Sequence, residues 1–83
     1  ISLAQENAKF GITVNTVSPG YIGTDMVMAV PEEVRNKIVA QIPTGRLGTP
    51  EEIAYAVAFF IPDDASWITG ANLAANGGQY MGW

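Results

Sequence analysis

The residues with the clearest chemical potential form a polar loop that directly follows an apolar run. The run Asn15-Thr16-Val17-Ser18-Pro19-Gly20-Tyr21-Ile22-Gly23-Thr24-Asp25-Met26 passes from β-branched residues into a Pro-Gly turn and then into hydroxyl and carboxylate side chains. Proline donates no hydrogen bond to a sheet ladder and fixes φ, so Pro19-Gly20 should end a strand. We therefore expect a ligand-facing loop at the carboxyl end of that strand.

Other chemistries are limited by the composition of the chain. It has no histidine, the commonest general base and metal ligand, and no cysteine for a disulfide or a thiolate metal site. The net charge of −4, without any basic cluster, argues against a nucleic-acid partner. The longest apolar stretch, residues 54–61, is too short to span a bilayer. We expect a cytoplasmic chain that binds no metal, no nucleic acid and no membrane.

The elements that would position the loop alternate between helical and strand patterns. Residues 2–9 have apolar side chains at helical spacing and end before Gly11, which can close a helix in the left-handed conformation. Residues 12–17 form an almost unbroken apolar run, the pattern of a strand covered on both faces in a parallel sheet. A second helix is predicted at 31–41, opened by proline and two acidic residues, and residues 27–30 before it could be a mobile cover.

A third helix has the most complete start signal in the chain. Thr49 is the expected N-cap, Pro50 takes the first helical position, and Glu52 stands where a capping box needs it. The helix should continue to about Phe60, and it is apolar almost all round, which indicates burial on more than one side. A short strand is predicted at 72–75.

Two strands cannot form a sheet with protected edges, so the rest of the sheet should come from elsewhere. The helical pattern begins at Ile1 without a cap, and we expect further residues upstream. The prediction is an α/β fold in which residues 1–83 are part of a single domain.

Three motifs follow one another along the chain. They are Asn15-x-x-Ser18-Pro19-Gly20 with Thr24 following, Arg46-x-Gly48-x-Pro50-Glu51-Glu52-Ile53-Ala54, and Thr69-Gly70-x-x-Leu73-x-x-Asn76-Gly77-Gly78. In this order and spacing they resemble the carboxyl-terminal third of a short-chain dehydrogenase/reductase. Residues 9–22 and 76–82 resemble the bacterial acetoacetyl-CoA reductases and their relatives, the 3-oxoacyl-acyl-carrier-protein reductases. The resemblance implies the last two strands and flanking helices of a Rossmann-like, doubly wound parallel sheet.

The activity implied by this resemblance is hydride transfer from NADPH to the 3-keto group of a short acyl thioester such as acetoacetyl-CoA, usually by a homotetramer. NADPH, like the acyl-CoA substrate, rests on the resemblance alone. The family's catalytic Ser, Tyr-x-x-x-Lys pair and Asn cannot be located, because Tyr21 is followed four residues later by Asp25 and Tyr55 by Phe59. The glycine-rich phosphate loop is also absent. No catalytic residue is assigned, and the expected partner is the upstream part of the same enzyme.

The same resemblance assigns four residues to the cofactor. Pro19 and Gly20 would shape the wall beside the nicotinamide, and the backbone of Ile22 would bind its carboxamide. The hydroxyl of Thr24 would bond the carboxamide or the pyrophosphate. The simpler alternative for Thr24 is that it only caps or turns the chain.

Tyr21 and Met26 are assigned to the substrate. Tyr21 could pack on the acyl or pantetheine part of a CoA thioester, or it could be an exposed loop tyrosine. Met26 would line the substrate side of a lid, with ordinary core packing as the alternative. Arg46 could meet a substrate phosphate or carboxylate, but we favour a salt bridge near the following helix.

The remaining motif residues have structural interpretations. Asn76-Gly77-Gly78 indicates a tight turn. Phe59 and Phe60 are expected in a core, whereas Tyr80 and Trp83 are expected to be buried in a partner subunit.

Two further functions stay open for this sequence. One is a non-catalytic fragment that acts as an interaction module by pairing with copies of itself. The other is a different oxidoreductase of the same family, which would act on a 3-oxoacyl-acyl-carrier-protein, a sugar or an alcohol.

Overall fold

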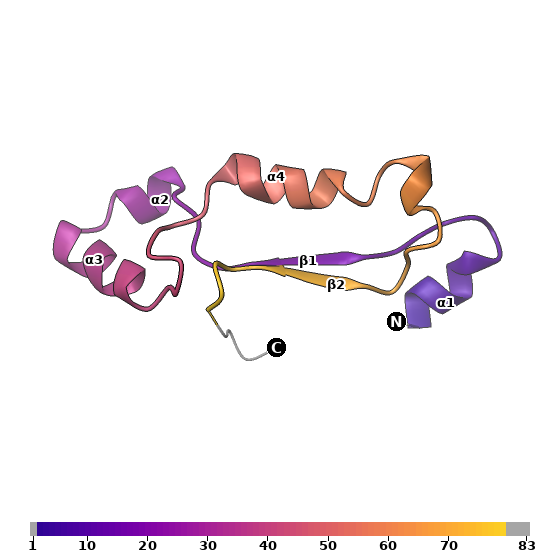
Figure 1. The fold of residues 1–83 in the computed structure, drawn as a ribbon, viewed down its shortest axis with the longest axis horizontal. Helices are drawn as coiled ribbons and strands as arrows, with labels where there is room; N and C mark the ends of the chain where they lie inside the picture. The colour runs from indigo at the N-terminus through magenta and orange to yellow at the C-terminus, as the bar shows by residue number, and fades with distance from the viewer. Residues whose placement is uncertain (1, 80–83) are drawn as a thin grey trace.

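The computed structural model describes residues 2–79 and has an α/β architecture (Figure 1). The elements in chain order are α1 (Ser2–Ala8), β1 (Thr16–Pro19), α2 (Asp25–Met28), α3 (Glu32–Ala40), α4 (Pro50–Ala58), the 3-10 turn η1 (Asp63–Ala65) and β2 (Asn72–Ala75). Strands β1 and β2 pair in parallel, with Thr16 opposite Asn72 and Pro19 opposite Ala75. The predicted α/β class and parallel pairing are confirmed.

The first strand lies further along the chain than predicted. Residues 12–15 are outside β1, and Pro19 is its last residue. The segment before β1 is held by side chains: Val14 N donates to Thr69 Oγ1 at 3.1 Å, and the Asn15 amide bonds Ile68 O and Ala71 N. Val14 O also accepts from Gly70 N at 2.8 Å, but the chain opposite this segment is irregular before Asn72, so the regular ladder starts only there, and the apolar run alone could not reveal this. The second strand has the predicted bounds.

Helix α4 starts as predicted and ends earlier. Thr49 Oγ1 accepts from Glu52 N and Glu52 Oε1 accepts from Thr49 N, which completes the capping box, with Pro50 as the first helical residue. The helix ends at Ala58 instead of Phe60. Helix α3 is one residue shorter at each end than the predicted 31–41.

Helix α2 lies in a segment that was expected to be loop. Its N-cap is Thr24, whose Oγ1 accepts from Val27 N at 3.4 Å, and Asp25 stands in the first turn, where a negative charge is favourable. A single turn has too few residues to show a helical period, so the pattern of the sequence did not separate it from loop.

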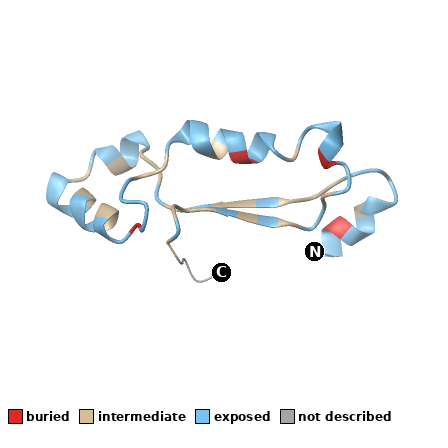
Figure 2. Ribbon diagram, in the orientation of Figure 1, coloured by how far each residue is buried: buried red, intermediate tan, exposed pale blue. Residues whose placement is uncertain are grey.

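One helix covers the sheet. Helix α4 lies along one face of both strands, while α1 lies beyond their amino ends and α2 and α3 beyond their carboxyl ends (Figure 1). The buried apolar residues are few and dispersed, namely Ala4, Ile42, Ala56 and Ala65 (Figure 2). Only Ala56 of α4 is buried, and Tyr55 on the same helix is 79% exposed. The predicted burial of α4 on more than one side is therefore not provided by the described residues themselves.

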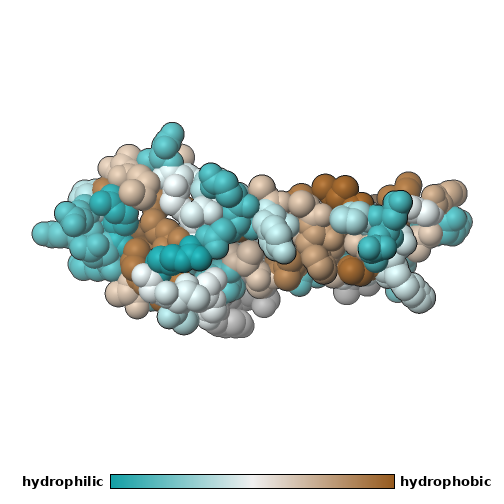
Figure 3. Space-filling view, turned by 45° about the horizontal axis from the view of Figure 1, so that its top comes forward, coloured by the Kyte–Doolittle hydropathy of each residue, from teal (hydrophilic) through white to brown (hydrophobic). Residues whose placement is uncertain are grey.

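The molecule is elongated and exposes much apolar surface. It measures 50 × 23 × 20 Å and has a radius of gyration of 15.7 Å, whereas a compact domain of this length would have about 12 Å. Its accessible surface is 6099 Å², against about 4,800 Å² for a folded monomer of this mass. Hydrophobic atoms gather over the half that contains the sheet and α4 (Figure 3). Within residues 2–79 we find no helix with the length and apolar character needed to cross a membrane.

Candidate functional site

The loops that follow the two strands meet at one edge of the sheet. Gly20 N donates to Ala75 O at 3.0 Å, which extends the pairing past the end of β1. Beyond it, the loop pairs with the segment before α4: Gly48 N donates to Tyr21 O at 3.0 Å and Gly23 N donates to Gly48 O at 2.8 Å. In open α/β sheets, ligands bind outside the carboxyl ends of the strands. The loop predicted to face a ligand is therefore at the edge where ligand sites form.

A pocket of about 500 Å³ opens at this edge. Its lining includes the loop after β1 with Tyr21 and Ile22, and the end of β2 with the turn after it. The other lining residues come from the loop before α4 and the first turns of that helix: Thr44, Arg46, Gly48, Glu52, Ile53, Tyr55 and Ala56. The pocket combines aromatic, aliphatic and backbone polar groups, the composition that small-molecule sites use.

An exposed ion pair joins two of the residues that line the pocket. Arg46 Nη1 and Nη2 donate to Glu52 Oε1 and Oε2 at 2.7 and 2.8 Å, which is a bidentate contact. The hydrogen bonds from Arg46 and from the backbone of Thr49 lower the pKa of Glu52 to about 2, and the same carboxylate raises the pKa of Arg46. The preferred interpretation of Arg46, a salt bridge with the following helix, is confirmed.

The turn after β2 packs tightly against the loop after β1. A Cβ atom at Gly20 would lie 2.8 Å from Asn76 Cβ and 2.9 Å from Asn76 Cα. Gly77 has φ +64° and Gly78 φ +91°, and the Asn76 side-chain oxygen accepts from Gly78 N at 3.0 Å. The predicted tight turn is confirmed, and the missing side chain of Gly20 is what permits the two loops to touch.

The backbone of Ile22 has the groups that a carboxamide requires. The bridge to Gly48 uses Tyr21 O and Gly23 N, and in an extended segment the groups of the intervening residue point to the opposite side. Among the described residues, Ile22 N–H donates no backbone hydrogen bond, and Ile22 O accepts one, from Thr24 N at 2.7 Å. A carbonyl oxygen has two lone pairs, so Ile22 offers one donor and one acceptor site to a planar amide. These two groups fit the carboxamide of a nicotinamide.

The predicted site residues are only partly brought together. Tyr21 and Ile22 line the pocket, and Pro19 and Gly20 lie in the strand end and turn directly before them. Thr24 caps α2, which was the simpler alternative for this residue, and its hydroxyl is exposed and can still donate. Met26 does not line the pocket and is 82% exposed. The assignments of these residues to cofactor and substrate stay predictions.

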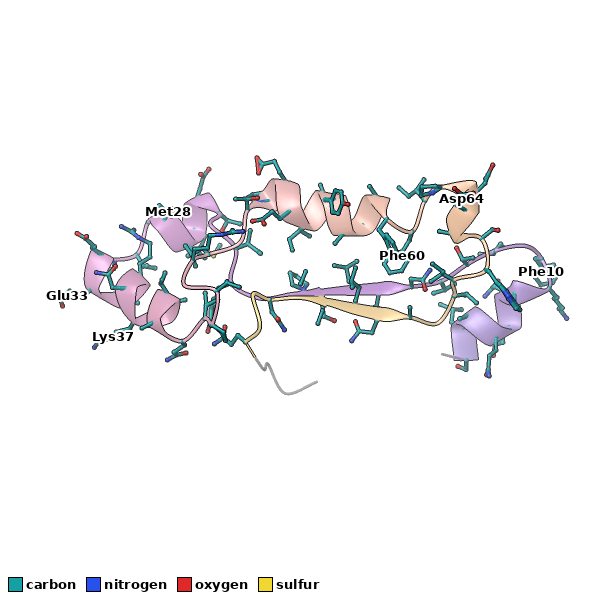
Figure 4. The ribbon with its side chains drawn as sticks, viewed as in Figure 1. Phe10, Met28, Glu33, Lys37, Phe60 and Asp64 are labelled. Atoms are coloured by element: carbon teal, nitrogen blue, oxygen red, sulfur yellow. The ribbon has the colours of Figure 1, made fainter. Side chains whose placement is uncertain are left out.

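The aromatic residues expected in contacts have different positions. Phe60 lies between the end of α4 and the sheet, where it lines a second hollow with Val17 and Val57 (Figure 4). Phe59 packs edge-to-face on Phe60 at 5.3 Å and is half exposed, so only part of the expected core packing is present. Tyr80 and Trp83 lie outside the described residues.

The sequence reasoning missed the second wall of the pocket. The sequence favours a structural role for the turn at Asn76, and it excludes Tyr55 as the catalytic tyrosine without giving it another role. The available signal was the parallel arrangement of the strands, since the carboxyl ends of parallel neighbours share one edge. In the part of the chain that the structure describes, no group of three or more acidic side chains could hold a metal ion.

Similar proteins are known. The family model described as Enoyl-(Acyl carrier protein) reductase matches residues 2–79. The acetoacetyl-CoA reductase of Rhizobium meliloti is 62% identical over 81 residues, which cover 96% of this chain and 34% of the relative. The 3-oxoacyl-(acyl-carrier-protein) reductase of Salmonella typhimurium is 58% identical over 80 residues, with 96% and 33% covered.

This chain spans about a third of the length of the curated relatives that it matches. The acetoacetyl-CoA reductase of Cupriavidus necator is 55% identical over 99% of the chain and 33% of the relative. The match extends over the strand ends, the loop between them and the capped helix α4. The chain belongs to the short-chain dehydrogenase/reductase family.

Proposed function

We propose that this chain contributes the nicotinamide side of the active site in an NADPH-dependent reductase. The complete enzyme would convert a 3-oxoacyl thioester, acetoacetyl-CoA, into the 3-hydroxyacyl thioester. The observation that carries the proposal is the Tyr21–Gly23 loop, held at the carboxyl ends of two parallel strands with the polar groups of Ile22 directed away from the Gly48 bridge. The identity of 62% to an acetoacetyl-CoA reductase supports the choice of substrate.

The chain's own residues would hold and orient the reactants. Ile22 would bind the carboxamide through its N–H and C=O, which fixes the face of the ring that meets the substrate. When bound, NADPH would supply a hydride to the 3-keto carbon and become NADP+, and a proton from a group outside this chain would reach the keto oxygen. Tyr21, which lines the pocket and is 37% exposed, would pack against the acyl chain or the pantetheine arm.

The acid and its orienting lysine would come from a part of the enzyme outside this chain. No tyrosine of the sequence has a lysine four residues later, so the general acid has to be supplied by another segment. We propose that residues 1–83 are part of one domain, that this domain is cytoplasmic, and that the complete enzyme is a homotetramer. The exposed apolar surface over the sheet and α4 supports coverage by further protein.

The test is a coupled measurement on the complete enzyme. NADPH oxidation at 340 nm would be followed with acetoacetyl-CoA, and again with NADH in place of NADPH. We expect turnover that is faster with NADPH. Turnover with neither nucleotide would reject the reductase function, and a preference for NADH would reject only the choice of cofactor.

A second candidate substrate is a 3-oxoacyl-acyl-carrier-protein. The identity of 58% to reductases of that name supports it nearly as well. The discriminating experiment compares kcat/KM for the CoA and the carrier-protein thioesters of the same acyl group. A higher kcat/KM for the carrier-protein thioester would replace acetoacetyl-CoA as the preferred substrate.

A further inference from the structure

The loop that would bind the nicotinamide is held by hydrogen bonds to a segment other than β1. Residues 21–23 follow β1, and their two bridging hydrogen bonds both go to one residue, Gly48. If Gly48 moves, residues 21–23 move with it, because these two hydrogen bonds are the only described ladder contacts of the loop beyond Gly20. The question is therefore what holds Gly48.

Gly48 is fixed from both sides by side chains of the ion pair. On its amino-terminal side, Arg46 Nη1 donates to Leu47 O at 3.1 Å. On its carboxyl-terminal side, Glu52 Oε1 accepts from Thr49 N at 3.0 Å. The Arg46 guanidinium also donates two hydrogen bonds, of 2.7 and 2.8 Å, to the Glu52 carboxylate. Residues 47 to 49 are thus enclosed in a ring of charge-assisted contacts.

Ile22 lies close to Gly48, so the position of Gly48 affects the position of the loop. A Cβ atom there would lie 2.9 Å from Ile22 Cδ1, so the loop and the segment are already at contact distance. A small displacement of residues 47–49 would lengthen both bridging hydrogen bonds and turn the Ile22 groups, and hydrogen bonds weaken steeply with distance and angle.

We infer that Arg46 and Glu52 are positioning residues for the Tyr21–Gly23 backbone: their ion pair fixes Gly48, and Gly48 fixes the groups that orient the nicotinamide. This inference rests on the proposed function for its consequence in cofactor binding, but the ordering of the loop can be measured without it. Neither side chain needs to touch the cofactor for the effect.

The experiment compares Glu52→Gln with Glu51→Gln in the complete enzyme. The amide oxygen of a glutamine at position 52 can still accept from the Thr49 backbone N–H, so the capping box at the start of α4 is retained. Only the bidentate ion pair with Arg46 is weakened. Glu51 carries the same charge in the same helical turn, does not line the pocket and is exposed. It is therefore the matched control for loss of one negative charge near the helix amino terminus.

Two readouts separate positioning from general stability. We expect Glu52→Gln to raise the NADPH dissociation constant on the order of three- to tenfold, with the KM for the thioester nearly unchanged. Amide hydrogen exchange at Gly23 and Gly48 should accelerate in Glu52→Gln and not in Glu51→Gln. Arg46→Lys keeps the positive charge but cannot form the bidentate contact with Glu52, and it should fall between wild type and Glu52→Gln in both readouts.

The inference is overturned if Glu52→Gln matches Glu51→Gln in the exchange of Gly23 and Gly48 while both remain folded. It is also overturned if NADPH affinity and thioester KM change together with the unfolding midpoint, since that pattern indicates a purely structural role. A wild-type enzyme that binds no NADPH would reject the proposed function instead, and the exchange data would still decide whether the pair orders the loop.

Discussion

At the scale of single residues, Gly20 is required by its neighbours and not by its backbone conformation. Its φ is not in the left-handed region, yet an added Cβ would meet the Cα and Cβ of Asn76 at 2.9 and 2.8 Å. Since Asn76 Cα is backbone, it cannot move without shifting the turn after β2. The distance between the loop after β1 and the turn after β2 therefore depends on a glycine at position 20.

We expect Gly20→Ala to destabilise the complete enzyme by about 1–3 kcal/mol, the usual cost of an overpacked contact. Urea unfolding would measure the change. Gly23→Ala is the matched control, because a Cβ there has its nearest contact at an ordinary 3.6 Å and the residue has no positive φ. Equal unfolding free energies for the two variants would show that the Gly20 contact is not tight in solution.

Thr24 is the residue at which two roles must be separated. Its hydroxyl oxygen caps α2, and the same hydroxyl is predicted to bond the cofactor. Thr24→Val should weaken NADPH binding by roughly 1–2 kcal/mol if a hydrogen bond to the ligand is lost. Isothermal titration would give the dissociation constant.

The control for Thr24→Val is Thr24→Asn, because asparagine is an efficient N-cap. If the asparagine variant has wild-type stability but still binds NADPH weakly, the hydroxyl contacts the ligand. If it restores both, Thr24 acts through α2 alone. An unchanged dissociation constant in Thr24→Val would remove this residue from the site.

At the scale of elements, the capping box of α4 joins the helix to the candidate site. Thr49 and Glu52 set the first turn of α4, and the same Glu52 carboxylate holds Arg46. We expect Thr49→Ala to cost about 1 kcal/mol of unfolding free energy, because one helix N–H loses its partner. Thr49→Ser should retain most of the stability, and a loss as large as that of the alanine variant would contradict the capping role.

The pKa of Glu52 predicts how this element responds to acid. The folded-state pKa is about 2, below the ordinary value of 4.5, so the unfolded chain binds a proton more readily. The stabilisation from this carboxylate is therefore complete above pH 4.5 and is lost as the pH falls towards 2. Urea midpoints measured from pH 7 to pH 3 should show the difference between wild type and Glu52→Gln shrinking below pH 4.5. A difference that stays constant or grows on acidification would contradict the depressed pKa.

The elements also show which features the sequence could predict. The start of α4 and the whole of β2 were predicted correctly, because a capping box and a strand closed by Asn-Gly-Gly are local signals. The end of β1 at Pro19-Gly20 was also predicted correctly, but its start at residue 12 was wrong, because the ladder begins where β2 begins, and that partner is more than fifty residues away in the chain. Helix α2 was missed because one turn carries no period.

The candidate site shows the same division between local and non-local information. The loop with Tyr21 and Ile22 was found from its own sequence, while the wall formed by the turn at Asn76 depends on the pairing of β1 with β2. A salt bridge of Arg46 near the following helix was predicted, but its partner Glu52 and its relation to Gly48, and through Gly48 to the loop, required the structure.

At the scale of the whole molecule, exposed apolar side chains are concentrated over the half that contains the sheet and α4 (Figure 3). Helix α3, in the other half, presents charged side chains such as Glu33 and Lys37 (Figure 4). The half that contains the sheet and α4 exposes apolar residues, including Trp67, which is 81% exposed. An apolar surface of this extent on a small domain is typical of a surface that other protein covers.

The exposed apolar surface predicts how residues 1–83 behave when they are produced alone. The surface excess over a compact monomer is about 1,300 Å², and the buried apolar residues of the described chain are one isoleucine and three alanines. We expect the isolated chain to bind a hydrophobic dye such as anilinonaphthalene sulfonate, to unfold without a sharp transition, and to associate at micromolar concentration. The complete enzyme is the control, and it should bind little dye and unfold cooperatively. A monomeric 83-residue chain with a sharp, concentration-independent transition and no dye binding would show that the exposed surface needs no further protein to cover it.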